Sequence, residues 1–362
     1  MRILFLAPFG QCEKQTVSRR LLPLARAMAA RGHDVELLIP PWDCPHEAGR
    51  VQRVAGVGVR WLALGPGARG VHPRLSRRMV RAVQDFAPDV LVVSKGLGYA
   101  GRAMSAWLAR GGRALLDVDD LEDERGWGAR RNWLLRRLLA RQEAMLAARA
   151  TGVVFASRFL ADDLTARHSG QRFLYLPNGL DRALERVRVE ENGRVALLFT
   201  RGNDVDVRRL ARVWRAVAER VADAELWIVG DWPDAPANLP RATVWGWLEG
   251  AALAAAVRGA ALCFFLPENT PLLRAKSPAR LLDCIGLGLP VATLDVGEYG
   301  ALARSVGGAV VGDEEDLVSW LTRLLQSPEL RESQSRQVWR RAEALSWSRR
   351  AAELDGWLSG LF

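Results

Sequence analysis

Short apolar runs and helical patterns alternate through the first half of the chain. Residues 2–7 form a continuous apolar run, and residues 16–31 then repeat apolar side chains at helical spacing as far as Gly32. Further runs of strand length follow, with helical patterns between most of them: residues 34–39, 57–64, 89–94, 113–118 and 152–156. Continuous apolar strands that alternate with helices are typical of a parallel sheet covered on both faces.

The same alternation restarts after a break near residue 177. Pro177-Asn178-Gly179 is a turn signal, and the charged residues 184–193 have no core pattern, which indicates a linker. Strand-like runs and then three closing helical patterns follow: 194–199, 225–229, 243–245, 260–266, 290–294 and 309–311, then 313–325, 329–345 and 348–361. We therefore predict two doubly wound α/β domains in tandem, at 1–182 and 183–344, with a helix at 345–362 that packs back toward the first. Ligands of such sheets bind beyond the carboxyl ends of the strands, and a cleft between two such domains is the default site.

Composition agrees with a folded cytoplasmic protein. Of the residues, 49% are hydrophobic and 25% charged, and the apolar runs are far shorter than the ~18 residues of a membrane span. Residues 3–9 indicate a first strand and not a signal peptide, since no small-residue cleavage pattern follows. The four cysteines, which form no CxxC pair, argue against a disulfide framework or a zinc site and favour a reducing compartment: Cys12, Cys44, Cys263 and Cys284.

The chain is strongly basic, with a net charge of +10 and a pI of about 10.3. Such a surface favours nucleotide phosphates, acidic lipids or nucleic acid as partners. We expect no nucleic-acid partner, because the charge is spread along the chain and no recognition motif is present. Of the 51 basic residues 48 are arginine, which draws attention to the lysines: Lys14, Lys95 and Lys276.

One of these lysines precedes a helical pattern that could bind an anion. Ser277 and Pro278 form a good helix start, with serine as the cap and proline at the first position. A helix N-terminus beside Lys276 is a ready anion site, and Asp283, two turns into the helix, could accept bonds from ribose hydroxyls. The residues alone equally allow a surface helix with an Arg280–Asp283 ion pair.

A second candidate for phosphate binding is the turn after the strand at 194–199. Backbone N–H groups at Arg201, Gly202 and Asn203 could approach a phosphate closely, and the Arg201 side chain could neutralise it. The alternative is an ordinary loop with one of the many arginines.

Acidic side chains gather where the strand at 113–118 ends. Because Asp119 lies in the run from Asp117 to Glu122, it could act as a base toward an acceptor hydroxyl or bind that hydroxyl. Lys95 ends another strand, and we place Gly10 and Lys14, after the first strand, on the acceptor side. The alternative is a strand end with solvated acids. We predict no metal, because the four histidines do not cluster.

The stretch 125–149 combines a helical apolar stripe with many arginines. Trp133, Leu134 and Leu138 belong to the stripe, and Arg137 and Arg141 are among the residues that flank it. A basic amphipathic helix with tryptophan can lie in an anionic membrane interface. A core-packed helix with a solvated arginine face has the same pattern, so both interpretations stay open.

An ordered set of motifs resembles the GT-B glycosyltransferases of the group-1, retaining type. They are the opening strand with RGHDVELL, LPNGLD at 176–181, ELWIVGDWP at 225–233, VWGWLE at 244–249, GLGLPV at 286–291 and LSWSRRAAEL at 345–354. The resemblance implies two Rossmann-like domains that face each other across a cleft, with a nucleotide-diphosphate sugar on the second and an acceptor on the first. It implies no cofactor beyond this donor.

The chain departs from the family signature of two glutamates separated by seven residues. Asp283 stands at the second position and Ala275 at the first, which leaves the donor sugar and the stereochemistry open. Lys276, Ser277 and Arg280 match a Lys-Ser-Pro-x-Lys/Arg variant, in which the lysine is expected at the diphosphate and the second acid at the ribose.

We therefore expect a hexosyltransferase (EC 2.4) that acts on a lipid-linked or glycan acceptor in cell-surface polysaccharide or glycolipid synthesis. We expect a cytoplasmic location, with peripheral attachment to the inner face of the cell membrane. One alternative is a catalytically silent scaffold of the same fold that binds nucleotide or membrane, which the loss of the first glutamate would favour. Another is a sugar-nucleotide epimerase of the same fold, for which the chain lacks a matching carboxylate and histidine set.

Overall fold

The structure is a computed structural model that divides into two compact units. It describes residues 1–12, 14–41, 43–64, 73–127, 132–166, 170–181, 186, 193–200, 204–230, 232, 239–248 and 250–361. The N-terminal unit comprises Met1–Gly179, Ala275–Ser277 and Trp347–Phe362, and the C-terminal unit comprises Leu180–Arg274 and Pro278–Ser346. The short segment Ala275–Ser277 thus belongs to the first unit, although its sequence neighbours belong to the second.

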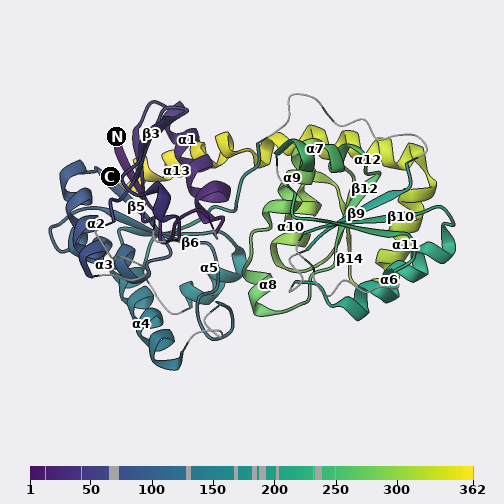
Figure 1. The fold of residues 1–362 in the computed structure, drawn as a ribbon, viewed down its shortest axis with the longest axis horizontal. Helices are drawn as coiled ribbons and strands as arrows, with labels where there is room; N and C mark the ends of the chain where they lie inside the picture. The colour runs from purple at the N-terminus through teal and green to yellow at the C-terminus, as the bar shows by residue number, and fades with distance from the viewer. Residues whose placement is uncertain are drawn as a thin grey trace. The chain divides into compact units, whose positions relative to one another are not determined.

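The N-terminal unit is built on one twisted sheet, shown in Figure 1. Its strands in the described residues are β1 (Arg2–Leu6), β2 (Asp34–Ile39), β3 (Val51–Val54), β4 (Val57–Trp61), β5 (Val90–Ser94), β6 (Ala114–Val118), β7 (Gly152–Phe155) and β8 (Phe173–Tyr175). Their order is β3-β4-β2-β1-β5-β6-β7-β8, and every pair is parallel except β3 with β4. Strands β1, β5 and β6 are therefore neighbours, and their carboxyl ends lie at one edge of the sheet.

Helices cover both faces of this sheet and bury two apolar cores. One core packs the π-helix η1 (Val17–Leu21), α1 (Leu22–Ala30) and α13 (Trp347–Leu361) against side chains such as Phe5 and Leu37. The other packs α2 (Pro73–Phe86), α3 (Gly98–Leu108), α4 (Trp133–Arg149) and α5 (Arg158–Thr165) against side chains such as Leu6 and Leu116. Strands buried on both faces explain why their sequences are apolar throughout.

The C-terminal unit contains a wholly parallel sheet. Its strands in the described residues are β9 (Val195–Phe199), β10 (Glu225–Val229), β11 (Ala242–Gly246), β12 (Leu262–Phe265), β13 (Val291–Leu294) and β14 (Ala309–Val311), in the order β11-β10-β9-β12-β13-β14. One core lies under α6 (Val207–Arg220) and α11 (Glu314–Gln326). The other lies under α7 (Gly250–Arg258), α9 (Ala279–Leu287), α10 (Gly297–Val306) and α12 (Pro328–Ala342). The prediction of tandem parallel α/β domains is confirmed.

The sequence expectations differ from the structure in three local features. The predicted helix at 16–31 begins as the π-helix η1 before α1 continues it. The short strands β3 and β8 were not predicted, because four and three residues carry too little periodicity for the pattern to register. The exclusion of a disulfide is wrong, since Cys12 and Cys44 are bonded with their Cα atoms 5.6 Å apart.

This disulfide has a simple topological origin. Cys12 follows β1 and Cys44 follows β2, and these two strands are adjacent and parallel. Loops that leave the same ends of neighbouring strands meet in space even when 32 residues separate them in sequence. Cysteine spacing along the chain does not reveal such a pairing.

Candidate functional site

Lys95 lies at the carboxyl end of β5, surrounded by carboxylates. The side chain is buried, and its Nζ is 3.1 Å from Asp119, 2.7 Å from Asp120 and 2.9 Å from Glu122. Lys95 adopts a left-handed backbone with φ of +48°, and its N–H donates to the carbonyl of Asp117 at 2.8 Å. A bulky residue in this conformation is strained, which is common at functional sites. We call these four residues the carboxylate cluster.

Burial and mutual repulsion shift the protonation of this cluster. Burial, with the nearby Asp120 and Asp117, raises the pKa of Asp119 to about 7, although Lys95 and Arg20 oppose the shift. Burial opposes the charge on Lys95, but Asp119, Asp120 and Glu122 raise its pKa well above the ordinary value. Asp119 therefore exchanges its proton near neutral pH beside a lysine that stays charged.

Asp119 also has an oxygen with spare hydrogen-bonding capacity. Its Oδ1 is buried and accepts no hydrogen bond from the part of the chain that the structure describes. Lys95 Nζ is close enough to form an ion pair with this oxygen but does not bond to it in hydrogen-bond geometry. A carboxylate oxygen can accept more than one hydrogen bond, so this oxygen can accept one from a hydroxyl outside the chain beside the Lys95 ammonium.

Helix α4 contributes a further carboxyl group, Glu143. Burial, with repulsion from the nearby Glu122 carboxylate, raises the pKa of Glu143 to about 7. The preceding residue, Gln142, fastens α4 to the start of α3, because its amide accepts from the N–H of Gly98 at 2.9 Å and donates to the Gly98 carbonyl at 3.0 Å. A Cβ at Gly101 would lie only 2.3 Å from the Gly96 carbonyl and 2.5 Å from Gln142 Nε2. The close approach of these groups to α3 therefore requires glycine at position 101.

The segment Ala275–Ser277 packs within the N-terminal unit. Ala275 is fully buried in the core beneath α2–α5. Ser277 Oγ accepts from the N–H of Asn178 at 2.9 Å, and the Ser277 carbonyl accepts from Asn178 Nδ2 at 2.9 Å. The predicted serine cap is wrong, because α9 begins at Ala279 with Pro278 at its cap and no capping side chain. Asn178 holds the hydroxyl that would have capped the helix.

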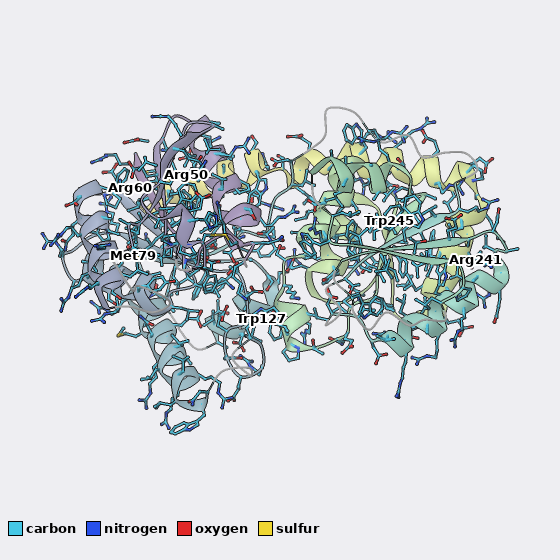
Figure 2. The ribbon with its side chains drawn as sticks, in the orientation of Figure 1. Arg50, Arg60, Met79, Trp127, Arg241 and Trp245 are labelled. Carbon is cyan, nitrogen blue, oxygen red and sulfur yellow. A yellow bond between two sulfur atoms is a disulfide. The ribbon has the colours of Figure 1, made fainter. Side chains whose placement is uncertain are left out.

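Lys276, between these anchored residues, precedes α9 and lies outside the helix. Helix α9 begins at Ala279, so Lys276 is not on the helix that bears Arg280 and Asp283. Its ammonium lies over the ring of Trp127, 5.5 Å from the centroid, and Figure 2 labels this tryptophan. An ammonium in this position is attracted by the electron-rich face of the ring.

Arg280 and Asp283 form the expected ion pair on α9 of the C-terminal unit, at 3.2 Å. The Arg280 guanidinium lies 4.6 Å from the centroid of the Trp247 ring and 5.8 Å from that of Phe199. Phe199 ends β9 and Trp247 follows β11, so these aromatic rings lie at the carboxyl ends of strands. The pair is partly exposed, 16% for Arg280 and 25% for Asp283.

Five other predicted residues follow the first strand of each unit, and their predicted roles stay predictions. Arg201, Gly202 and Asn203 lie outside the described residues, so their predicted role at a phosphate stays a prediction. Lys14 is exposed. Gly10 lies against Asp43, because a Cβ there would be 1.7 Å from the Asp43 carboxylate. Within the described ranges, no three His, Cys, Asp or Glu side chains are grouped so as to hold a metal ion.

Sequence reasoning missed Arg20 and Glu143. Arg20 on η1 is buried and pairs with Asp117, but it is one of 48 arginines and nothing in its sequence context marks it. Glu143 falls within the arginine-rich stretch 125–149, and nothing in its sequence context marks it either. The raised pKa of Glu143 follows only from the way α4 packs in the folded chain.

Helix α4 also exposes much of its apolar surface. Figure 1 shows α4 extending away from the sheet of its unit. Ten large hydrophobic residues are exposed among those described, and half of them are on this helix: Trp133, Leu134, Leu135, Leu138 and Met145. No helix in the described ranges is long and apolar enough to span a membrane.

Comparison with known families identifies the class of protein. The model of Glycosyltransferase Family 4 matches residues 17–184, and a model described as Glycosyl transferase-like matches residues 208–356. The chain belongs to the GT-B glycosyltransferases of the group-1, retaining-type family, family 4. It is therefore a glycosyltransferase (EC 2.4) that uses a nucleotide-sugar donor, and the resemblance drawn from its motifs is confirmed.

Solved structures of this architecture match over the whole chain. Sucrose-phosphate synthase from Thermosynechococcus elongatus has a TM-score of 0.72 at 16% identity, covering 100% of this chain and 99% of its own. HepE from Anabaena, in complex with UDP, has a TM-score of 0.70 at 14% identity, covering 99% and 100%. WaaG, a glycosyltransferase involved in lipopolysaccharide biosynthesis, has a TM-score of 0.64 at 17% identity, covering 97% and 99%. A sequence search among curated proteins finds no significant match.

Proposed function

We propose that the protein transfers a hexosyl group from a nucleoside-diphosphate sugar to a hydroxyl of a lipid-linked or glycan acceptor, in cell-surface polysaccharide or glycolipid synthesis. The observation that carries the proposal is the buried Oδ1 of Asp119, which accepts no hydrogen bond from the described residues. An acceptor hydroxyl could donate its hydrogen bond to this oxygen. With a pKa raised to about 7, the carboxylate can take up the hydroxyl proton as the new glycosidic bond forms.

Lys95 serves this reaction by holding the cluster together. Its single charge faces Asp119, Asp120 and Glu122, so the cluster keeps a negative excess that raises proton affinity. We assign Gly10 and Lys14 to the acceptor side as well, since they lie in the loop after β1, a neighbour of β5 in the sheet.

The donor is assigned to the chain around α9. Asp283 is suited to accept bonds from ribose hydroxyls, and the Arg280 guanidinium over Trp247 offers a flat surface beside it. Lys276 is the cation for the diphosphate, with Ser277 beside it, and Arg201, Gly202 and Asn203 are expected to contact phosphate through N–H groups. The transfer needs no metal in this scheme, because these cations neutralise the leaving diphosphate.

A thermal-shift panel tests the donor assignment. UDP, GDP, ADP, CMP and dTDP are added with their sugar conjugates, and binding to the native state raises the melting temperature. We expect one base to give a clear shift, and its sugar conjugate to be consumed when an acceptor is supplied. A shift without turnover would favour the silent scaffold, and no shift with any ligand would contradict the proposal.

We further propose that α4 attaches the protein to an anionic lipid surface at the inner face of the cell membrane. Leu134, Leu138 and Met145 are about half exposed, and Arg137 and Arg141 are exposed on the same helix. Residues 133–142 contain no acidic side chain. Apolar side chains flanked by cations fit the boundary between headgroups and acyl chains.

Vesicle flotation tests this attachment. The Leu134→Glu/Leu138→Glu variant should lose binding to vesicles that contain phosphatidylglycerol, because two charges then face the acyl chains. Val244→Glu is the matched control, since Val244 is similarly exposed on β11 of the other unit. Equal flotation of the two variants, or none for the wild type at low salt, would contradict attachment through α4.

A further inference from the structure

A chain of hydrogen bonds connects the buried Arg20 to Ser277, one of the residues proposed to bind the nucleotide-sugar donor. Arg20 is 1% exposed, and its Nε lies 2.8 Å from Asp117 Oδ2 while its Nη2 lies 2.5 Å from Oδ1. Nη2 also donates to the Leu176 carbonyl at 3.2 Å, and Nη1 donates to Asn178 Oδ1 at 3.0 Å. The guanidinium therefore joins the end of β6 to the Pro177-Asn178-Gly179 turn.

The geometry of this pair is better suited to orientation than to stability. A buried ion pair gains little net stability, because desolvation offsets the attraction between the charges. Two parallel hydrogen bonds to one carboxylate, however, fix the plane of a guanidinium. With Asp117 holding that plane, Nη1 can reach only one place, and Asn178 Oδ1 lies there.

Asn178 passes this orientation on to Ser277. Since its Oδ1 accepts from Arg20, its Nδ2 is the group that faces the Ser277 carbonyl, at 2.9 Å. The Asn178 backbone N–H donates to Ser277 Oγ at 2.9 Å as well. Ser277 is thus held at both its side chain and its backbone.

Lys276 lies between two anchored residues as a result. On one side Ala275 is fully buried in an apolar core, and on the other Ser277 is held by Asn178. The Lys276 ammonium over Trp127 completes its placement.

We propose that Arg20 is a positioning residue that sets the location of the Lys276 ammonium through Asn178 and Ser277, and so controls affinity for the donor diphosphate without touching it. The inference rests on the proposed role of Lys276 at the diphosphate. Asp117, which orients Arg20, precedes Asp119 by two residues on the same strand end, so the segment that holds the acceptor base also orients the diphosphate cation.

A double-mutant cycle tests this inference. Arg20→Lys keeps the charge beside Asp117, but an ammonium cannot bond to Asp117 and Asn178 in the same fixed plane. The probes are the nucleoside diphosphate that shifts the melting temperature in the panel and its monophosphate. We expect Arg20→Lys to weaken the diphosphate about 5- to 30-fold, leave the monophosphate nearly unchanged, and have no further effect in the Lys276→Met background.

Three further variants guard against a folding defect. Ser277→Ala removes only the hydroxyl that accepts from Asn178, and should weaken the diphosphate in the same direction by about threefold, whereas Ser277→Thr should restore it. Arg26→Lys, at an exposed arginine on α1, is the matched control and should change nothing.

The outcomes distinguish a failure of the positioning role of Arg20 from a failure of the proposed role of Lys276 at the diphosphate. If Lys276→Met leaves diphosphate affinity unchanged, the proposed role of Lys276 is wrong. If Lys276→Met weakens binding but neither Arg20→Lys nor Ser277→Ala does, positioning by Arg20 is wrong. Equal losses for Arg20→Lys in the presence and absence of Lys276 would also overturn it, because the two residues would then act independently.

Discussion

Two charged groups, one in each unit, lie near the carboxyl ends of parallel strands but differ in burial. In the N-terminal unit, Lys95 is buried against three carboxylates, and the pKa of Asp119 is raised to about 7. In the C-terminal unit, one cation faces one carboxylate, Arg280 with Asp283, and both remain partly open to solvent. The first arrangement alters proton affinity and suits chemistry, whereas the second is a partly exposed ion pair and suits reversible binding.

The largest predicted effect is a loss of kcat when the carboxylate cluster of the N-terminal unit is changed. Asp119→Asn removes the proton acceptor, so kcat should fall by about 10²- to 10⁴-fold while donor affinity stays unchanged. Transfer rates and nucleotide binding, measured on the same preparation, check this. Asp120→Asn is the matched control, because it also removes a carboxylate from Lys95 but should cost less than about tenfold. Similar losses for both would assign the effect to the lysine environment and not to Asp119.

A smaller effect of a different kind is expected in the C-terminal unit. Asp283→Ala should weaken nucleotide binding by about 10- to 100-fold, since it removes a charged acceptor of hydrogen bonds. Calorimetric titration with the diphosphate measures this directly. Asp223→Ala is the control, because Asp223 also pairs with an arginine but lies before β10 and not after a strand. A loss of binding in the control as well would point to the fold and not to the site.

Most of the fold was predictable, because strands buried on both faces leave continuous apolar runs such as residues 2–7 and 152–156. The acid run and Lys95 were also predictable, since strand ends can be located from the same runs. Their meeting in one cluster was only implied, and it depends on β5 and β6 being neighbours. Arg20 and Glu143 could not be predicted, because only tertiary packing buries a common arginine and raises the pKa of a helical glutamate. The cap at Ser277 failed because a residue 99 positions away, Asn178, competes for its hydroxyl.

The smallest predicted effect concerns stability at the edge of the cluster. The pKa of Glu143 is raised in the folded chain to about 7, so the unfolded chain loses this proton first as pH rises above about 4.5. The group therefore lowers stability progressively between about pH 4.5 and 7. Glu143→Gln should match the wild type at pH 4.5 and exceed it by about 1–3 kcal/mol at pH 8.

Urea unfolding at the two pH values measures this difference. Glu124→Gln, at a glutamate that is 71% exposed, is the control and should show no such dependence. A Glu143→Gln variant that parallels the wild type at both pH values would show that burial does not perturb this carboxyl group.

The pH dependence of kcat tests the central claim most directly, because that claim requires Asp119 to take up a proton during transfer. Once the panel has identified the donor, the rate should rise about tenfold per pH unit below about 7 and level off above it. Asp120→Asn should move the midpoint to lower pH, since it removes a charge that raises the pKa of Asp119. A rate that is flat from pH 5 to 8, in both proteins, would contradict the account.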